Sequence, residues 1–132
     1  MFKRNKKFLP LLLALAFPFF CVGCSTDTPA TYEQISGAEA KALMDSESGY
    51  IIIDARTREE YDEGHIPGAI LIPEYEIADR AETELPDKDQ LILVYCRSGR
   101  RSKIAAEELV KLGYTNVKEF GGIIDWEYET VK

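Results

Sequence analysis

The chain has few cysteines and histidines: three cysteines in 132 residues and one histidine, His65. Cys21 and Cys24 close an apolar N-terminal run, so the rest of the chain carries Cys96 alone. Disulfide frameworks need paired cysteines, so a lone one cannot staple its own domain. Nothing in the sequence places His65 within reach of Cys96. We therefore expect Cys96 to be a reactive group.

The sequence also lacks an apolar run long enough to span a membrane as a helix. The longest, residues 8–22, has 15 residues where a spanning helix needs about 18–20, and Pro10 and Pro18 interrupt it. Four basic residues lie among the seven that precede it, and Gly23 follows it. A charged start, an apolar core and a small residue before a cut predict a secretory signal over residues 1–23. A retained membrane anchor is the alternative.

Residues 22–24, Val-Gly-Cys, resemble a bacterial lipobox, in which the signal is cut before a cysteine that is then lipidated. The third position back is Cys21, where the family usually has leucine. The resemblance implies that Cys24 carries the lipid. Residues 24–31 are small and polar and contain proline, as in a flexible tether. We expect the domain, residues 32–132, to be anchored by this lipid to a bacterial membrane on its extracytoplasmic side.

Basic residues are scarce, with 16 lysines and arginines against 23 acidic residues and a net charge of −7. Removal of the signal takes four basic residues with it, which leaves twelve against 23 and a charge of −11. A domain this acidic should bind neither nucleic acid nor, through its own surface, an anionic bilayer.

Three of the twelve basic residues that remain are arginines that lie within five residues of Cys96. Residues 91–95 are large and apolar, which is typical of a parallel strand buried on both faces, and residues 103–112 have a helical pattern. Cys96 should then lie at the C-terminal end of a strand, where open α/β sheets bind ligands. The positive end of the helix and the arginines favour a thiolate, which is the nucleophilic form.

Strand and helix patterns alternate from residue 32 onward. The predicted strands are residues 32–35, 50–54, 69–72, 91–95 and 117–120. Two predicted helices begin with capping boxes, at residues 36–39 and 57–60. Three more are predicted at residues 74–82, 103–112 and 123–128. Gly121-Gly122 is predicted to be a turn. This alternation predicts an α/β fold with a parallel sheet covered on both faces.

Four segments together resemble a single-domain rhodanese. They are Ile52–Arg56 with its Asp-x-Arg end, Glu60–Ala69 with Gly-His-Ile-Pro-Gly-Ala, the loop Val94–Ser102, and the C-terminal signature of Gly113–Val117, Gly121–Ile123 and Trp126. The resemblance implies a doubly wound five-stranded parallel sheet and a sulfurtransferase that uses no cofactor or metal.

In this family the cysteine that matches Cys96 takes sulfane sulfur from an anionic donor such as thiosulfate and becomes a persulfide. A thiol, cyanide or a partner protein then removes the sulfur, so one transfer is split into two steps. The loop residues Arg97, Ser98, Gly99, Arg100 and Arg101 are the candidates for substrate binding, through backbone amides and, for the arginines, through charge. Arg101 is the favoured arginine because it lies where the helix begins.

Asp54, Arg56 and His65 form a second group that is tempting as a catalytic set with Cys96. Asp54 and Arg56 end a neighbouring strand, and we interpret them as a buried ion pair. We interpret His65, which follows Gly64 on a loop, as structural, since family members are not thought to need a histidine base.

Two alternatives use the same cysteine. A phosphatase or arsenate reductase of this fold has five residues between cysteine and arginine, which would put the arginine at position 102; here that position is Ser102 and Arg101 comes one residue earlier. A loop that is one residue shorter suits a sulfur atom better than a tetrahedral phosphate. The other alternative is a non-catalytic carrier that holds the persulfide for a partner protein.

Overall fold

The computed structural model describes residues 31–132. The predicted signal (residues 1–23), the predicted lipidation site Cys24 and the tether up to residue 30 lie outside the described residues. Within residues 31–132, no helix has the length and apolar composition that crossing a bilayer requires.

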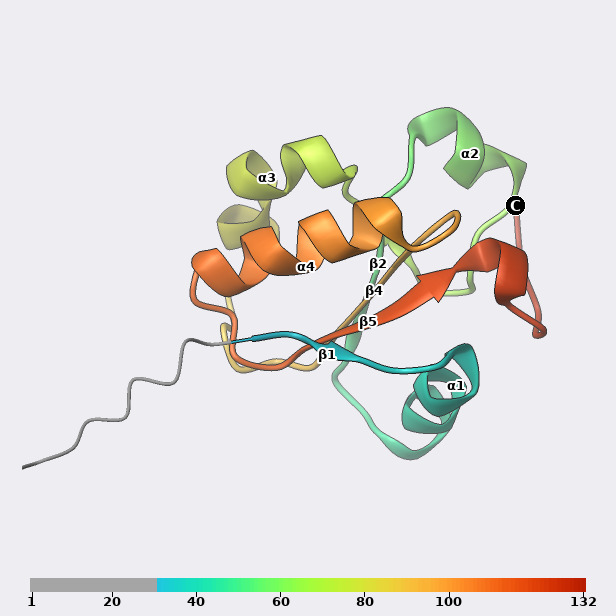
Figure 1. The fold of residues 1–132 in the computed structure, drawn as a ribbon, viewed down its shortest axis with the longest axis horizontal. Coiled ribbons are helices and arrows are strands. Elements are labelled where there is room, and N and C mark those ends of the chain that lie inside the picture. Colours follow the sequence, from blue (N-terminus) through green and yellow to red (C-terminus); the bar gives the residue numbers. More distant parts are fainter. Residues whose placement is uncertain (1–30) are drawn as a thin grey trace, which may run out of the picture.

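Five strands form one parallel sheet in the order β1-β5-β4-β2-β3, as Figure 1 shows. The strands are β1 (Glu33–Gln34), β2 (Ile51–Asp54), β3 (Ile70–Leu71), β4 (Ile92–Cys96) and β5 (Val117–Gly122). The helices are α1 (Gly37–Ser46), α2 (Arg58–Glu63), α3 (Ile77–Glu84) and α4 (Arg100–Lys111), with 3₁₀ turns η1 (Glu74–Glu76) and η2 (Ile123–Asp125). The predicted α/β fold with a parallel sheet and helices is confirmed.

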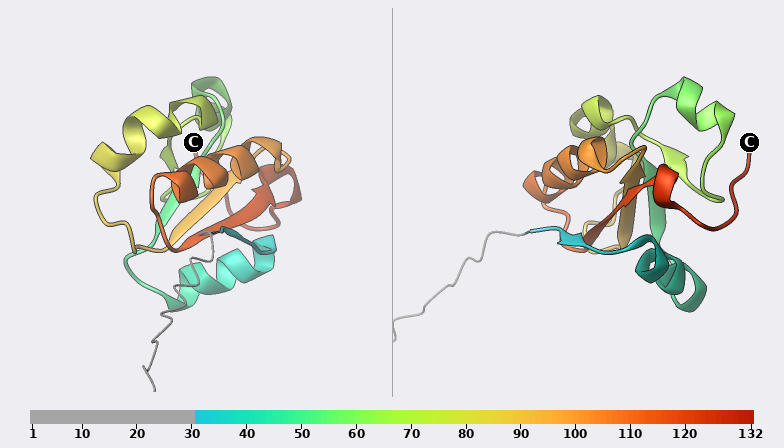
Figure 2. Two further views of the ribbon diagram at one scale, coloured as in Figure 1. Left: turned by 60° about the vertical axis from the view of Figure 1, so that its left-hand side comes forward. Right: turned by 45° about the vertical axis from the view of Figure 1, so that its right-hand side comes forward.

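The helices cover the two faces of the sheet unequally (Figure 2). On one face, α3 and α4 pack on β4 and its neighbours through an apolar cluster that includes Val94, Ala105 and Leu109. On the other face, α1 and the segments after α2 and β5 enclose a second cluster around Leu93 and Phe120. All five residues of β4 are buried, as expected for a central parallel strand.

Both predicted capping boxes are present. Ser36 accepts from the Glu39 N–H and Thr57 from the Glu60 N–H, while each glutamate reaches back to the cap backbone. These local hydrogen bonds start α1 and α2 at the residues that the sequence pattern indicates. α4 begins at Arg100, three residues before the predicted helical pattern, because its first three residues are polar and show no apolar periodicity.

The prediction of a turn at Gly121-Gly122 is wrong: β5 continues through both residues, and Gly122 pairs with Cys96. Gly122 has an extended backbone that any residue can adopt (φ −124°, ψ 150°), so no turn requires glycine here. Glycine is required because the neighbouring backbone leaves no room for a Cβ. The predicted last helix is shorter than expected, because only Ile123–Asp125 form a 3₁₀ turn. The chain then runs on so that its C-terminal end lies beside α2, where Val131 bridges His65 (Figure 1).

Candidate active site around Cys96

Cys96 ends β4, the middle strand of the sheet, and its side chain is buried with 1% of its surface exposed. Its Sγ accepts a hydrogen bond from the Gly99 N–H at 3.0 Å and lies 3.3 Å from the Ser102 Oγ. Gly99 belongs to the loop that joins β4 to α4 at the C-terminal edge of the sheet, and Ser102 lies in the first turn of α4 (Figure 1). The structure therefore surrounds the sulfur with hydrogen-bond donors at the edge where parallel sheets bind ligands.

The backbone of Gly99 brings the loop back to the sulfur. Gly99 has φ 108°, in the region that side chains rarely adopt, and it caps α4 without a side chain of its own. A Cβ at this residue would lie at an ordinary contact distance of 3.6 Å from the Gly121 Cα, so the positive φ is what favours glycine here. Because α4 starts at the next residue, the unpaired N–H groups of its first turn lie just after the loop.

Two opposing effects act on the pKa of the Cys96 thiol. Burial is the largest single effect and raises this pKa, whereas hydrogen bonds from the Ser102 hydroxyl and from the backbone of Ser102, Gly99 and Ser98 lower it. Together the hydrogen bonds win, and the pKa of Cys96 lies below its ordinary value. The thiolate is thus favoured by hydrogen bonds from the loop and from Ser102 at the start of α4.

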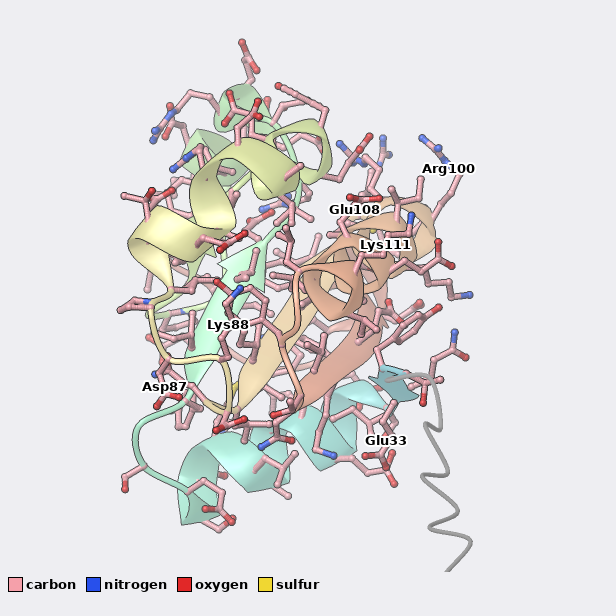
Figure 3. All side chains as sticks on the ribbon, turned by 90° about the vertical axis from the view of Figure 1, so that its left-hand side faces the viewer. Glu33, Asp87, Lys88, Arg100, Glu108 and Lys111 are labelled. Carbon is pink, nitrogen blue, oxygen red and sulfur yellow. The ribbon has the colours of Figure 1, made fainter. Side chains whose placement is uncertain are left out.

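The three arginines of the loop have different surroundings. Arg97 and Arg100 are exposed, and Figure 3 shows Arg100 extending away from the start of α4. Arg101 is half-buried and makes a bidentate ion pair with Glu60 of α2, at 2.7 and 2.9 Å. The hydrogen bond from Arg101 lowers the pKa of Glu60 to about 2, against the effect of burial.

Arg101 is therefore held by α2 with its charge in the neighbourhood of the sulfur: its pKa is raised chiefly by Glu60, and the charge of Cys96 adds to this rise. Ser98 is exposed at the tip of the loop. The roles of Arg97 to Arg101 in holding a substrate stay predictions.

Asp54 and Arg56 form a buried ion pair, with the Arg56 Nη2 2.8 Å from the Asp54 Oδ2. Tyr95 donates to the same oxygen at 2.7 Å and accepts from the Ile66 N–H at 3.1 Å. Arg56 also donates to the Gly64 carbonyl oxygen at 2.7 Å. This network ties the ends of β2 and β4 to the segment after α2, and its contacts in the structure are with one another and with backbone.

His65 lies on that same segment. Its ring stacks on Tyr61 at a centroid distance of 3.7 Å, and its Nδ1 is 2.9 Å from the Tyr61 carbonyl oxygen. None of the contacts of His65 in residues 31–132 involves Cys96.

Two residues of the site were not among the candidates from the sequence. Ser102, in the first turn of α4, lies 2.6 Å through its Oγ from the Oε1 of Glu119, and Glu119 is a β5 residue with 3% of its surface exposed. The Glu119 Oε1 also accepts the Gly121 N–H at 2.8 Å. Glu119 follows Lys118 in the sequence, so no local pattern indicated that this carboxyl would be buried beside the cysteine.

Known proteins resemble the chain over most of the described residues. Thiosulfate sulfurtransferase PspE of Escherichia coli is 44% identical over 80 residues, which cover 61% of this chain and 77% of PspE. The putative sulfurtransferase YtwF of Bacillus subtilis is 37% identical over 98 residues, covering 74% of this chain and 93% of YtwF. A solved structure described as a rhodanese with anions from E. coli superposes with a TM-score of 0.60 at 42% identity, covering 63% of this chain and 98% of that one.

Residues 36–129 match the family described as the rhodanese-like domain. This match runs from the cap of α1 to the segment after η2, so it contains every strand from β2 to β5 and the whole loop around Cys96. With sulfurtransferases among its relatives and a buried cysteine at the end of the middle strand, the chain belongs to the rhodanese family of sulfur-transfer proteins.

Proposed function

We propose that this protein moves sulfane sulfur from an anionic donor of the thiosulfate type to a thiophilic acceptor, through a persulfide on Cys96. The observation that carries the proposal is the pair of hydrogen-bonding groups on the sulfur, the Gly99 N–H at 3.0 Å and the Ser102 Oγ at 3.3 Å. A sulfur that is buried yet has a lowered pKa is suited to nucleophilic attack.

In the first step the Cys96 thiolate attacks the outer sulfur of thiosulfate. A Cys96 S–S bond forms, the S–S bond of the donor breaks, and sulfite leaves with the bonding electron pair, while the persulfide keeps one negative charge. In the second step cyanide or a thiolate attacks the outer persulfide sulfur, and Cys96 returns as a thiolate. Thiocyanate is the product when cyanide is the acceptor.

The loop is suited to hold the persulfide anion. The outer sulfur would extend from Cys96 toward the N–H groups of residues 97–101 and the start of α4, which act as preorganised donors for an anion. Exposed Arg97 and Arg100 would attract the anionic donor toward an otherwise acidic domain. Arg101, held by Glu60, would contribute its charge at longer range.

The test combines an activity with a covalent readout. Purified full-length protein should form thiocyanate from thiosulfate and cyanide. After thiosulfate alone, the tryptic peptide of residues 89–97 should gain about 32 Da, the mass of one sulfur. Cys96→Ser should lose both, and an adduct that persists in this variant would refute the assignment. An adduct without thiocyanate formation would identify the carrier alternative.

The phosphatase or arsenate reductase alternative is tested with the same preparation. Arg101 comes one residue early for a phosphate loop and is already paired with Glu60. We expect no release of phosphate from an aryl phosphate. Phosphate release without thiocyanate formation would overturn the proposal of sulfur transfer.

A further inference from the structure

We propose that Glu119 and Ser102 form a proton relay with Cys96, in which the thiol proton reaches the Glu119 carboxylate through the Ser102 hydroxyl as the nucleophilic thiolate forms. The inference deepens the proposed function, because it names the group that activates the cysteine. It makes Ser102 and Glu119 positioning residues for the proton, and it assigns a role to the one buried carboxylate on β5.

We infer the relay from the number of hydrogens available to the Ser102 hydroxyl, which is smaller than the number of its polar contacts. Ser102 has one hydroxyl hydrogen, but its Oγ lies 2.6 Å from the Glu119 Oε1, 3.3 Å from the Cys96 Sγ, and 3.0 and 3.4 Å from the carbonyl oxygens of Gly99 and Gly121. Two oxygens 2.6 Å apart have a hydrogen between them, at the short distance typical of charge-assisted bonds. The contact with Cys96 then needs a second hydrogen, which comes from the thiol or from the carboxylic acid.

Two arrangements satisfy both contacts. In the first, Cys96 is a thiol that donates to the Ser102 Oγ, and Ser102 donates to the Glu119 carboxylate. In the second, Glu119 is a carboxylic acid that donates to Ser102, and Ser102 donates to the Cys96 thiolate. The arrangements differ by the shift of one hydrogen along each contact, so the trio keeps one negative charge and exchanges no proton with solvent.

Burial disfavours a third arrangement in which both ends are charged. Cys96 and Glu119 have 1% and 3% of their surfaces exposed, and one hydroxyl group separates them. No lysine or arginine in residues 31–132 makes an ion pair with Glu119. Two buried anions that share one donor repel each other, so the second proton should leave the trio only at higher pH.

The charged groups around the trio have partners or lie in solvent. On α4, Arg101 carries a raised pKa because of Glu60 of α2, whose own pKa is lowered to about 2. The Gly121 N–H on β5 donates to the Glu119 Oε1, and it can do so in both arrangements of the trio. The other charged groups of the elements that pack here are paired or exposed: Asp54 with Arg56, Lys118 with Glu33, and Arg97, Arg100 and Lys103 in solvent.

The test measures how fast Cys96 is alkylated by iodoacetamide between about pH 4 and about pH 10, where carboxylates and thiols titrate. Mass spectrometry of the peptide of residues 89–97 reports Cys96 without interference from Cys21 or Cys24. In the wild-type full-length chain, the logarithm of the rate should rise in two steps separated by a plateau, because the trio contains a constant fraction of thiolate in between.

Glu119→Gln keeps the shape of the side chain but cannot take up the proton. Its profile should rise in a single step and fall by about tenfold per pH unit below the pKa of the thiol, while the wild type stays flat. Ser102→Ala should also lose the plateau, and it carries the test if the glutamine variant does not fold. His65→Gln, which alters the one histidine, should keep both steps.

A wild type with a single step, or a plateau that survives Glu119→Gln, would overturn the relay. A plateau lost in Glu119→Gln but kept in Ser102→Ala would also overturn it, because Glu119 would then act without the hydroxyl. The assay uses no sulfur donor. A two-step alkylation profile without thiocyanate formation would therefore contradict the proposed function and leave the relay intact. Thiocyanate formation with a single-step profile would contradict the relay and leave the proposed function intact.

Discussion

Gly122 of β5 and Arg97 of the active loop approach each other so closely that a Cβ on Gly122 would lie 2.0 Å from the Arg97 carbonyl oxygen. Gly122 is paired with Cys96, and the Ile124 N–H donates to the same Arg97 oxygen at 3.3 Å. The end of β5 is thus the surface on which the first residues of the loop rest. The shape of the loop around the sulfur depends on a residue 26 positions further along the chain from Cys96.

Gly122→Ala should distort the loop, because the Cβ would meet backbone atoms of Arg97 and Ser98 that cannot turn aside as a side chain can. We expect a loss of about 1–3 kcal/mol in the free energy of unfolding, as for other overpacked sites, together with a large loss of thiocyanate formation. Urea unfolding and the sulfur-transfer assay measure the two effects. Gly37→Ala is the matched control, since its Cβ would meet Trp126 at an ordinary 3.5 Å; a variant at Gly122 that behaves like this control would contradict the close packing.

Glu60→Gln should weaken the anchoring of Arg101 beside the loop. The pKa of Glu60 is lowered to about 2, so the ion pair stabilises the fold fully above the ordinary pKa of the carboxyl, 4.5, and loses this effect as the pH falls toward about 2. We expect the variant to be less stable than the wild type by about 1 kcal/mol at neutral pH, a value kept small because the pair is partly exposed to solvent.

The difference between wild type and Glu60→Gln should shrink steadily between pH 4.5 and about 2, in urea unfolding at several pH values. Glu59→Gln, at the exposed neighbouring residue of α2, should change stability little at any pH. A difference between wild type and Glu60→Gln that does not depend on pH would show that the carboxyl charge is not what stabilises the pair.

Tyr95→Phe should destabilise the fold by about 1–3 kcal/mol, because it leaves the buried Ile66 N–H without its acceptor and removes one hydrogen bond to the buried Asp54 Oδ2, which keeps those from Arg56. Alkylation of Cys96 should be affected far less, since the Tyr95 hydroxyl makes its hydrogen bonds away from the sulfur. Tyr75→Phe, at a side chain with 66% of its surface exposed, is the control and should stay within the small range of surface substitutions. Equal stability of the two variants would contradict the network.

The proposal that Cys24 carries a lipid predicts that protein extracted from bacterial membranes has lost residues 1–23 and gained the mass of a lipid at its new N-terminus. Intact-mass analysis measures both changes. Cys24→Ser should abolish the added mass, whereas Cys21→Ser should leave it. A chain that stays in the membrane with residues 1–23 attached would instead indicate a retained anchor.

Local patterns in the sequence were sufficient for most of the fold. The apolar run of β4 marked a strand buried on both faces, and the capping boxes at Ser36 and Thr57 marked the starts of α1 and α2. Such signals come from residues a few positions apart, so they can be recognised in the sequence without knowledge of the tertiary structure. The same reasoning placed Cys96 at the end of a strand and before a helix.

The sequence by itself thus determined the α/β parallel fold and the cysteine loop at its edge. Tertiary structure alone decided the surroundings of the sulfur. Because β5 lies beside β4, Gly122 supports the loop and Glu119 faces Ser102. Because α2 packs beside the start of α4, Glu60 holds Arg101. These contacts join residues 17 to 41 positions apart. Their partners are chosen by the packing order of the strands and helices, and a pattern that repeats every two or 3.6 residues carries no information about that order.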